Sequence, residues 1–180
     1  TLTEGTPKVV DAYFSDSIVE QEVVDVLVAM EKTANHPLAN ALLKHFEANE
    51  VLDLEVENII GQGLNAQYND KHYRIGAPTQ FNDVPDFFKD LLHKYQNQGN
   101  TVVFMSVDDE IIGAVAMMDM PHSSAKSVID YLKSVNIHTI MITGDAAQTG
   151  QAIGNMLGID EVIGDVKPEN KAEIVKQLQS

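Results

Sequence analysis

Thr143-Gly144-Asp145 has residue types suited to holding a phosphate group. The tripeptide follows a short β-branched apolar run at residues 137–142, and a helical pattern begins directly after it. A strand, a small polar turn and a helix together present backbone N–H groups and polar side chains at the carboxyl edge of an α/β sheet, where phosphates bind. An ordinary strand-to-helix turn that binds nothing is the alternative, because the tripeptide is short and common.

Lys171 can supply a positive charge at the same edge of the sheet. It follows Pro168 at the start of the last predicted helix. A lysine ammonium in that place can neutralise the charge of a transferring phosphoryl group. A solvated surface lysine also fits this position.

Glu31 and His36-Pro37 form a second polar combination, at the end of one predicted helix and the start of the next. The carboxylate and the imidazole are five residues apart and can form a polar opening on an apolar domain. Such an opening can recognise a planar ligand such as a nucleobase, with the imidazole stacking or bonding and the carboxylate accepting from an amino group. An exposed histidine at a helix end, without a ligand, is the alternative.

Gly61-Gln62-Gly63 lies between two predicted strands, where glycines let the backbone approach a ligand closely. No helix follows, so the segment is not a Rossmann fingerprint, and a bulge or tight bend also accounts for it. The six histidines show no paired spacing of the kind found in zinc sites, and the sequence has no cysteine.

The first two thirds of the chain are predicted to combine antiparallel strands with helices. The valine-rich residues 19–32 have strand propensity, but their length and acidic first half favour an amphipathic helix. Pro37 suits the first position of the next helix and puts His36 at or beside its N-cap. Asn69-Asp70 and Asp108-Asp109 predict hairpin turns. The predicted strands are residues 8–14, 53–58, 63–68, 72–76, 101–107 and 110–117, and the predicted helices are residues 19–32, 36–50 and 84–98.

After Met118, helices and strands alternate strictly, which is typical of a parallel α/β sheet. Gly158 is suited to ending the helix that follows the phosphate-type turn. The change of pattern near Asp119 predicts a boundary between an antiparallel α+β part and a parallel α/β part. The predicted helices are residues 121–136, 146–157 and 167–178, and the predicted strands are residues 137–142 and 161–163.

The composition limits the possible functions of these 180 residues. A formal net charge of −15 argues against a nucleic-acid or acidic-membrane surface, and an anionic ligand must be held by local donors. No stretch has the length of a membrane span, and no signal peptide is expected. Thr1 is not an initiator methionine, so we expect the first residue to be a cut point.

Taken in order, these motifs resemble those of the ATP-binding region of heavy-metal-transporting P-type ATPases. Thr1-Leu2-Thr3-Glu4-Gly5 resembles the end of the family's Asp-Lys-Thr-Gly-Thr-Leu-Thr phosphorylation motif. Glu31 with His36-Pro37 resembles the Glu…His-Pro signature of the metal-pumping branch, and Gly61-Gln62-Gly63 resembles its Gly-x-Gly. Thr143-Gly144-Asp145 and Pro168-Glu169-Asn170-Lys171 resemble motifs shared by P-type ATPases in general.

The resemblance implies an antiparallel-sheet nucleotide-binding domain, residues 7–116, inserted into a partial haloacid-dehalogenase-like parallel α/β domain, residues 1–6 and 117–180. It implies that Glu31 and His36 contact adenine, and that Gly61 and Gly63 lie along the triphosphate. It also implies a phosphate site in the second domain, in which Lys171 stabilises the phosphoryl group held by Thr143, Gly144 and Asp145.

Some family motifs are absent or altered in this sequence. The phosphorylated aspartate and the Gly-Asp-Gly-x-Asn-Asp magnesium motif do not occur, so Mg²⁺ is expected only in the full-length protein. For the same reason this chain alone is expected to be inactive. The family's Asp-x-x-Arg hinge is replaced by Asp119-Met120-Pro121-His122. Ile75-Gly76-Ala77-Pro78 has alanine where copper pumps usually carry asparagine, which is more similar to zinc and cadmium pumps.

The resemblance therefore implies the ATP-binding module of a pump that couples ATP hydrolysis, through an aspartyl-phosphate, to metal export. The expected partners are ATP and the membrane and actuator domains of the same polypeptide, with this segment on the cytoplasmic side of the cell membrane. Neither nucleic acid nor direct membrane insertion is expected. The alternatives are a regulatory module that senses ATP and a soluble phosphatase of the same fold. The phosphatase is disfavoured because no Asp-x-Asp nucleophile motif occurs.

Overall fold

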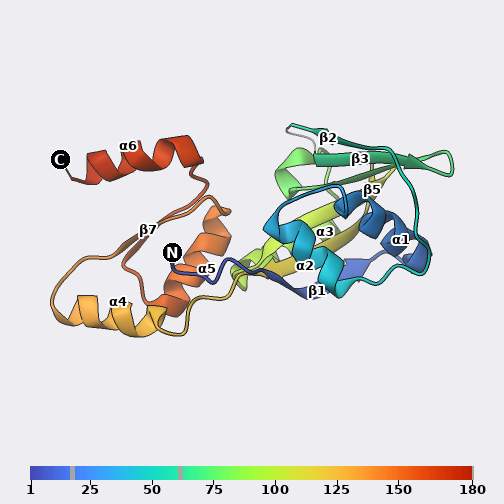
Figure 1. Cartoon of the computed structure of the whole chain (residues 1–180). Helices are drawn as coiled ribbons and strands as arrows, with labels where there is room; N and C mark the ends of the chain where they lie inside the picture. The colour runs from blue at the N-terminus through green and yellow to red at the C-terminus, as the bar shows by residue number, and fades with distance from the viewer. Residues whose placement is uncertain (17–18, 61–62, 180) are drawn as a thin grey trace. The chain divides into compact units, whose positions relative to one another are not determined.

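The computed structural model describes residues 1–16, 19–60 and 63–179, which divide into two compact units (Figure 1). None of the helices in these ranges has the length and apolar character needed to cross a bilayer. Unit 1 comprises Thr1–Glu4, His93–Thr101 and Met120–Ser180, and unit 2 comprises Gly5–Leu92 and Val102–Asp119.

A six-stranded sheet with the order β1-β6-β5-β4-β3-β2 forms the framework of unit 2. The pairs β1–β6, β2–β3, β3–β4 and β4–β5 run antiparallel. The turn residues Asn69, Asp70, Asp108 and Asp109 have φ of 49°, 59°, 47° and 68°, a left-handed conformation that Asn and Asp tolerate well. The two predicted hairpins are confirmed. The strands are β1 (Lys8–Phe14), β2 (Val56–Ile59), β3 (Gly63–Tyr68), β4 (Lys71–Gly76), β5 (Thr101–Val107) and β6 (Glu110–Met118).

Helix α1 (Glu20–Glu31) contributes six buried apolar residues to the core of unit 2: Val23, Val24, Val26, Leu27, Val28 and Met30. Every residue from Val23 to Glu31 is buried, so tertiary burial outweighs the strand propensity of the valines. α1 packs against β3, and helix α2 (Pro37–His45) packs against α1 and β1. The helix predicted at residues 19–32 is confirmed, and so is the start of the helix predicted at residues 36–50. The largest fully buried side chains of this core are Leu27, Met30, Leu42, Tyr73, Met105 and Met117.

α2 ends at His45, whereas the sequence predicted a helix to about residue 50. Phe46 has an extended backbone, with φ −96° and ψ 127°. Its ring packs edge-on against Phe14 of β1, with the ring centroids 5.9 Å apart. Burying this ring against the sheet stabilises the early exit from the helix, and helical periodicity cannot show such a long-range contact.

Helix α3 (Asp86–Asn97) and the short 3₁₀ turn η1 (Pro78–Gln80) bring aromatic side chains onto β5. Phe81 and Phe88 both pack edge-on against Phe104, with ring centroids 5.8 Å and 5.9 Å apart. The predicted helix at residues 84–98 is confirmed within two residues at its start and one at its end. The turn η1 was not predicted.

Unit 1 contains the parallel strand pair β7 (Ile140–Ile142) and β8 (Glu161–Ile163). Helix α5 (Ala147–Leu157) approaches β8 closely, because a Cβ atom on Gly154 would lie 2.4 Å from Cγ2 of Val162. Gly158 ends α5 with φ 76°, as predicted. The other helices are α4 (Ala125–Ser134) and α6 (Pro168–Leu178).

Two predicted elements of unit 1 are shorter in the structure. α4 begins at Ala125 instead of Pro121, because Pro121 forms an isolated antiparallel bridge with Thr3. The strand predicted at residues 137–142 is limited to β7, and its three residues are half-buried. The two residues before β7, His138 and Thr139, make side-chain contacts to the loop before β8 instead.

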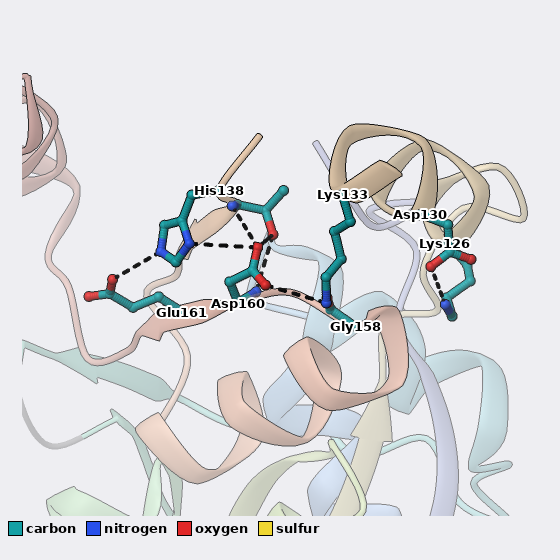
Figure 2. A network of polar contacts seen from close by, with 8 residues as sticks. Lys126, Asp130, Lys133, His138, Gly158, Asp160 and Glu161 are labelled. Carbon is teal, nitrogen blue, oxygen red and sulfur yellow. Dashed lines mark hydrogen bonds and ion pairs between the residues drawn. The ribbon is translucent and has the colours of Figure 1, made fainter. Parts of the chain in front are cut away.

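Asp160 is the centre of this polar network, which Figure 2 shows. Its Oδ2 accepts hydrogen bonds from the Thr139 backbone N–H at 2.9 Å and the Thr139 hydroxyl at 2.8 Å. Lys133 Nζ lies 3.3 Å from Asp160 Oδ1. The His138 ring lies between two carboxylates, with Nδ1 3.8 Å from Asp160 and Nε2 3.7 Å from Glu161. The hydrogen bonds from Thr139, with a smaller contribution from Lys133, lower the pKa of Asp160 to about 2.

We predict that Asp160→Ala lowers the melting temperature of unit 1. Asp160 has a depressed pKa in the folded chain, so its charged form stabilises the fold above the ordinary pKa of 3.8. This contribution is lost as the pH falls from that value to about 2, so the wild-type and variant melting curves should converge in that window. Thermal melts across the pH range check this.

Asp130→Ala is the matched control, because Asp130 is an exposed carboxylate whose one ion pair within residues 1–16, 19–60 and 63–179 is with Lys126 of its own helix. It should leave the melting temperature almost unchanged. If the two substitutions lower the melting temperature equally, or if the Asp160→Ala difference persists at the acid end, the charged form of Asp160 does not stabilise the fold.

Candidate functional site

The turn after β7 contains the predicted phosphate segment and is closed by its own hydrogen bonds. The Thr143 N–H donates to Ile163 O at 2.9 Å, and the Asp145 N–H donates to the Thr143 hydroxyl at 3.1 Å. That hydroxyl donates to Asp145 Oδ2 at 3.0 Å. Thr143-Gly144-Asp145 is therefore an ordered turn at the carboxyl end of a parallel strand, with Gly144 and Asp145 exposed.

Two amides of this turn remain available for an anion. The N–H groups of Gly144 and Ala146 have no hydrogen-bond acceptor within residues 1–16, 19–60 and 63–179. The next amide, that of Ala147 at the start of α5, donates to Oδ2 of Asp165 at 3.1 Å. A protein carboxylate thus occupies the α5 terminus, and a phosphate at this turn would use Gly144 and Ala146.

Lys171 is exposed in the second turn of α6. In the described part of the chain, it makes no hydrogen bond or ion pair with Thr143-Gly144-Asp145. The backbone before α6 is nevertheless tied to that turn. The Val166 N–H donates to Thr143 O at 3.1 Å, and the Asp165 N–H donates to Asp145 O at 2.8 Å. The approach of Lys171 to the turn is therefore set by the few residues that connect β8 to α6.

Glu31 is the last residue of α1 and is only 2% exposed. Its Oε2 has no hydrogen-bond partner among the described residues. Desolvation raises the pKa of Glu31 to about 7. A buried acceptor without a donor is costly, so Glu31 would gain from a ligand that supplies an N–H group. A ligand reaches this oxygen only after a local rearrangement of the residues that bury it.

His36 is the N-cap residue of α2, as predicted, and its ring is exposed. Nδ1 accepts a hydrogen bond from the Ala39 N–H at 3.1 Å. Nδ1 must be unprotonated to accept, so the proton of the neutral ring is on Nε2, where it can donate to a ligand. The connection from α1 to α2 is short and hydrogen-bonded, since the Ala34 N–H donates to Glu31 O at 3.0 Å.

Gly61 lies outside the described residues, and Gly63 begins β3 with φ 84°. A Cβ atom on Gly63 would lie 2.2 Å from Ile75 O and 3.0 Å from the Cα of Gly76. Only glycine fits here, because both the conformation and the approach of β4 exclude a side chain. Gly76 of the Ile75-Gly76-Ala77-Pro78 segment lies beside Gly63 in the structure, although it was not among the predicted site residues.

Two cavities of unit 2 lie away from these residues. One of about 270 Å³ is lined mainly by polar side chains, and one of about 260 Å³ lies between β1 and the end of α2. Neither includes Glu31, His36 or Gly63. Among the described residues, no group of three or more His, Cys, Asp and Glu side chains is arranged to hold a metal ion. The first cavity is lined by Gln21, Glu22, Asp25, Asn49, Glu50, Leu52 and Tyr68, and the second by Pro7, Lys8, Val9, Ala41, Lys44 and His45.

Comparison with known proteins relates the whole chain to one family. Residues 1–180 match the family model of haloacid dehalogenase-like hydrolases. The chain is 34% identical over its full length to a probable cadmium-transporting ATPase of Alkalihalophilus pseudofirmus, of which it covers 27%. It is 35% identical to a probable copper-transporting ATPase of Arabidopsis thaliana, of which it covers 19%. The chain thus spans about a quarter or less of the length of these curated relatives.

Solved structures extend this relationship to the fold. A zinc-transporting PIB-type ATPase matches 99% of the chain with a TM-score of 0.69 and 29% identity, and the chain covers 30% of it. The catalytic domain of the CPx-ATPase CopB-B matches 99% of the chain with a TM-score of 0.70, and 63% of that domain is covered; at 20% identity this supports the fold alone. The chain therefore belongs to the haloacid dehalogenase-like hydrolases, and over its whole length it is similar to part of the heavy-metal-transporting P-type ATPases.

Proposed function

We propose that this chain is the ATP-binding region of a heavy-metal pump, on the cytoplasmic side of the cell membrane. The observation that carries the proposal is the buried Oε2 of Glu31, which has no hydrogen-bond partner among the described residues and lies five residues before the exposed ring of His36 in the chain. An acceptor-only carboxylate suits the exocyclic amino group of adenine, and the Nε2–H of His36 suits a ring nitrogen or a stacked base. The sequence identity of 34% and 35% to a probable cadmium-transporting ATPase and a probable copper-transporting ATPase supports the same assignment.

In this proposal the two units have different tasks. Unit 2 binds the nucleotide, with adenine at Glu31 and His36 and the triphosphate along Gly61, Gly63 and the neighbouring Gly76, because glycines let the backbone approach a ligand closely. Unit 1 holds the transferring phosphoryl group at its carboxyl-edge turn. The amides of Gly144 and Ala146 are the available donors there, and Lys171 supplies the positive charge.

The reaction needs groups that this sequence does not contain. Phosphoryl transfer requires an in-line nucleophile, and the Asp-Lys-Thr-Gly motif that would supply the aspartate does not occur in the sequence. The described side chains also do not fit Mg²⁺, because no acidic or histidine cluster among them can hold a metal. We therefore propose that the chain binds ATP without hydrolysing it, and that nucleophile and magnesium site come from the rest of the pump. Ala77, where copper pumps usually have asparagine, favours zinc or cadmium as the transported ion.

We predict that His36→Asn weakens ATP binding by about tenfold, which corresponds to about 1.4 kcal/mol. Asparagine is a good N-cap, so it can still accept from the Ala39 N–H while the imidazole ring is lost. Isothermal titration of the 180-residue chain with ATP measures the affinity, and thermal melts show whether α2 stays capped.

His45→Asn is the matched control, because His45 is an exposed histidine at the other end of the same helix. It should leave ATP affinity unchanged. If His36→Asn binds ATP as tightly as the wild-type chain, the imidazole does not contact the nucleotide and the proposed adenine site is wrong.

We predict that Glu31→Gln stabilises the chain at pH 8 but not at pH 5. The pKa of Glu31 is raised from 4.5 to about 7 in the folded chain, so the unfolded chain releases this proton first as the pH rises. The fold therefore loses up to about 3 kcal/mol of stability as the pH rises from 4.5 to 7, and glutamine removes this loss. Urea unfolding at the two pH values measures it. If Glu31→Gln changes the free energy of unfolding equally at pH 5 and pH 8, Glu31 is not a buried ionisable group.

A further inference from the structure

Asp165 lies in the turn between β8 and α6 and makes two contacts with the turn after β7. Its carboxylate accepts a hydrogen bond from the Ala147 N–H at 3.1 Å, and its own N–H donates to Asp145 O at 2.8 Å. The side chain and the backbone of one residue thus bond to both ends of the segment from Asp145 to Ala147. The amide of Ala146, between these two ends, is one of the two amides of the turn that bond to no acceptor in the part of the chain that the structure describes.

The backbone of Asp165 is held in an uncommon conformation. Its φ is 56°, which costs a non-glycine residue energy and which Asp and Asn tolerate best. The neighbouring residues are fixed by packing: a Cβ atom on Gly164 would lie 2.5 Å from the Cα of Ala147, and Val166 is only 7% exposed. The turn therefore packs directly against the start of α5, and the hydrogen bond from the Ala147 N–H to the carboxylate of Asp165 joins the two segments.

The same turn determines where α6 begins. Val166 bonds to Thr143, and Pro168 starts α6 two residues later, with Lys171 in its second turn. Lys171 has no hydrogen bond or ion pair of its own that would orient it within the described part of the chain. Its position relative to Gly144 and Ala146 consequently depends on the contacts of Asp165 and Val166.

We propose that Asp165 is a positioning residue for the phosphoryl group: its hydrogen bond to Ala147 fixes the free amides of the Thr143-Gly144-Asp145 turn and the approach of Lys171 to them. This inference rests on the proposed function of that turn. A negative charge beside a phosphate is unfavourable in itself. The role of Asp165 is therefore to accept a hydrogen bond, and an uncharged acceptor of the same shape should serve as well.

The test is a titration of the ¹⁵N-labelled 180-residue chain with inorganic phosphate, followed through the amide resonances of Gly144 and Ala146. Asp165→Gly removes the acceptor but permits the positive φ, whereas Asp165→Asn keeps both the acceptor and the conformation. Asp165→Gly should weaken phosphate binding by about tenfold, and Asp165→Asn should bind within about twofold of the wild-type chain or more tightly. Asp130→Asn removes one charge from an exposed ion pair of unit 1 and should change nothing.

The outcomes separate the two proposals. If the wild-type chain binds phosphate at Gly144 and Ala146 and Asp165→Gly binds it equally well, Asp165 does not position the turn. If both Asp165 variants tighten binding alike, the carboxylate only repels the phosphate and the inference is overturned. If phosphate leaves the wild-type amides of Gly144 and Ala146 unchanged, the proposed phosphate role of the turn fails, and the role of Asp165 fails with it.

Discussion

Burial of α1 within unit 2 is the constraint on which the nucleotide-binding proposal depends. From Val23 onward every residue of α1 is buried, and each large apolar side chain removed from water contributes about 1.5–3 kcal/mol. This burial extends to the last residue of the helix, so Glu31 is taken from water together with the apolar residues before it. The cost appears in the raised pKa of its carboxyl group and in its Oε2, to which no described residue donates a hydrogen bond. A ligand with a matching donor would offset that cost.

The candidate phosphate site of unit 1 differs from the candidate adenine site of unit 2, because it is made mainly from backbone groups and not from side chains. The amides and carbonyls of Thr143 and Asp145 and the Thr143 hydroxyl are already bonded within the turn or to the loops around β8. The few donors that remain are therefore held in fixed positions, which is what electrostatic stabilisation of a phosphoryl group requires. A chain with a net charge of −15 needs such local, directed donors, since its overall field opposes an anion.

Local patterns in the sequence predicted most elements of the fold. Asn69-Asp70 and Asp108-Asp109 identified both hairpins because their turn chemistry is local, and Gly158 identified the end of α5 for the same reason. The errors arose where distant contacts decide the outcome. α2 ends before its predicted end because Phe46 packs on Phe14. α4 begins after its predicted start because Pro121 pairs with Thr3.

The residues of the candidate sites were predictable from the sequence, but their surroundings were not. Motif spacing indicated Glu31, His36 and Thr143-Gly144-Asp145 and gave no information on the residues that fold against them. The capping bond of His36, the burial of Glu31 and the capping of α5 by Asp165 depend on residues brought together by folding. Gly76 is beside Gly63 only because β3 and β4 pair in the observed register.

The central claim is that adenine is bound at the junction of α1 and α2. Intermolecular nuclear Overhauser effects between the adenine ring protons of bound ATP and the labelled chain measure this directly. We expect contacts from adenine to the His36 ring and to residues at the end of α1, with Glu31 among the resonances that shift most. Contacts confined to the cavity lined by Lys8, Lys44 and His45, or to unit 1, would contradict it.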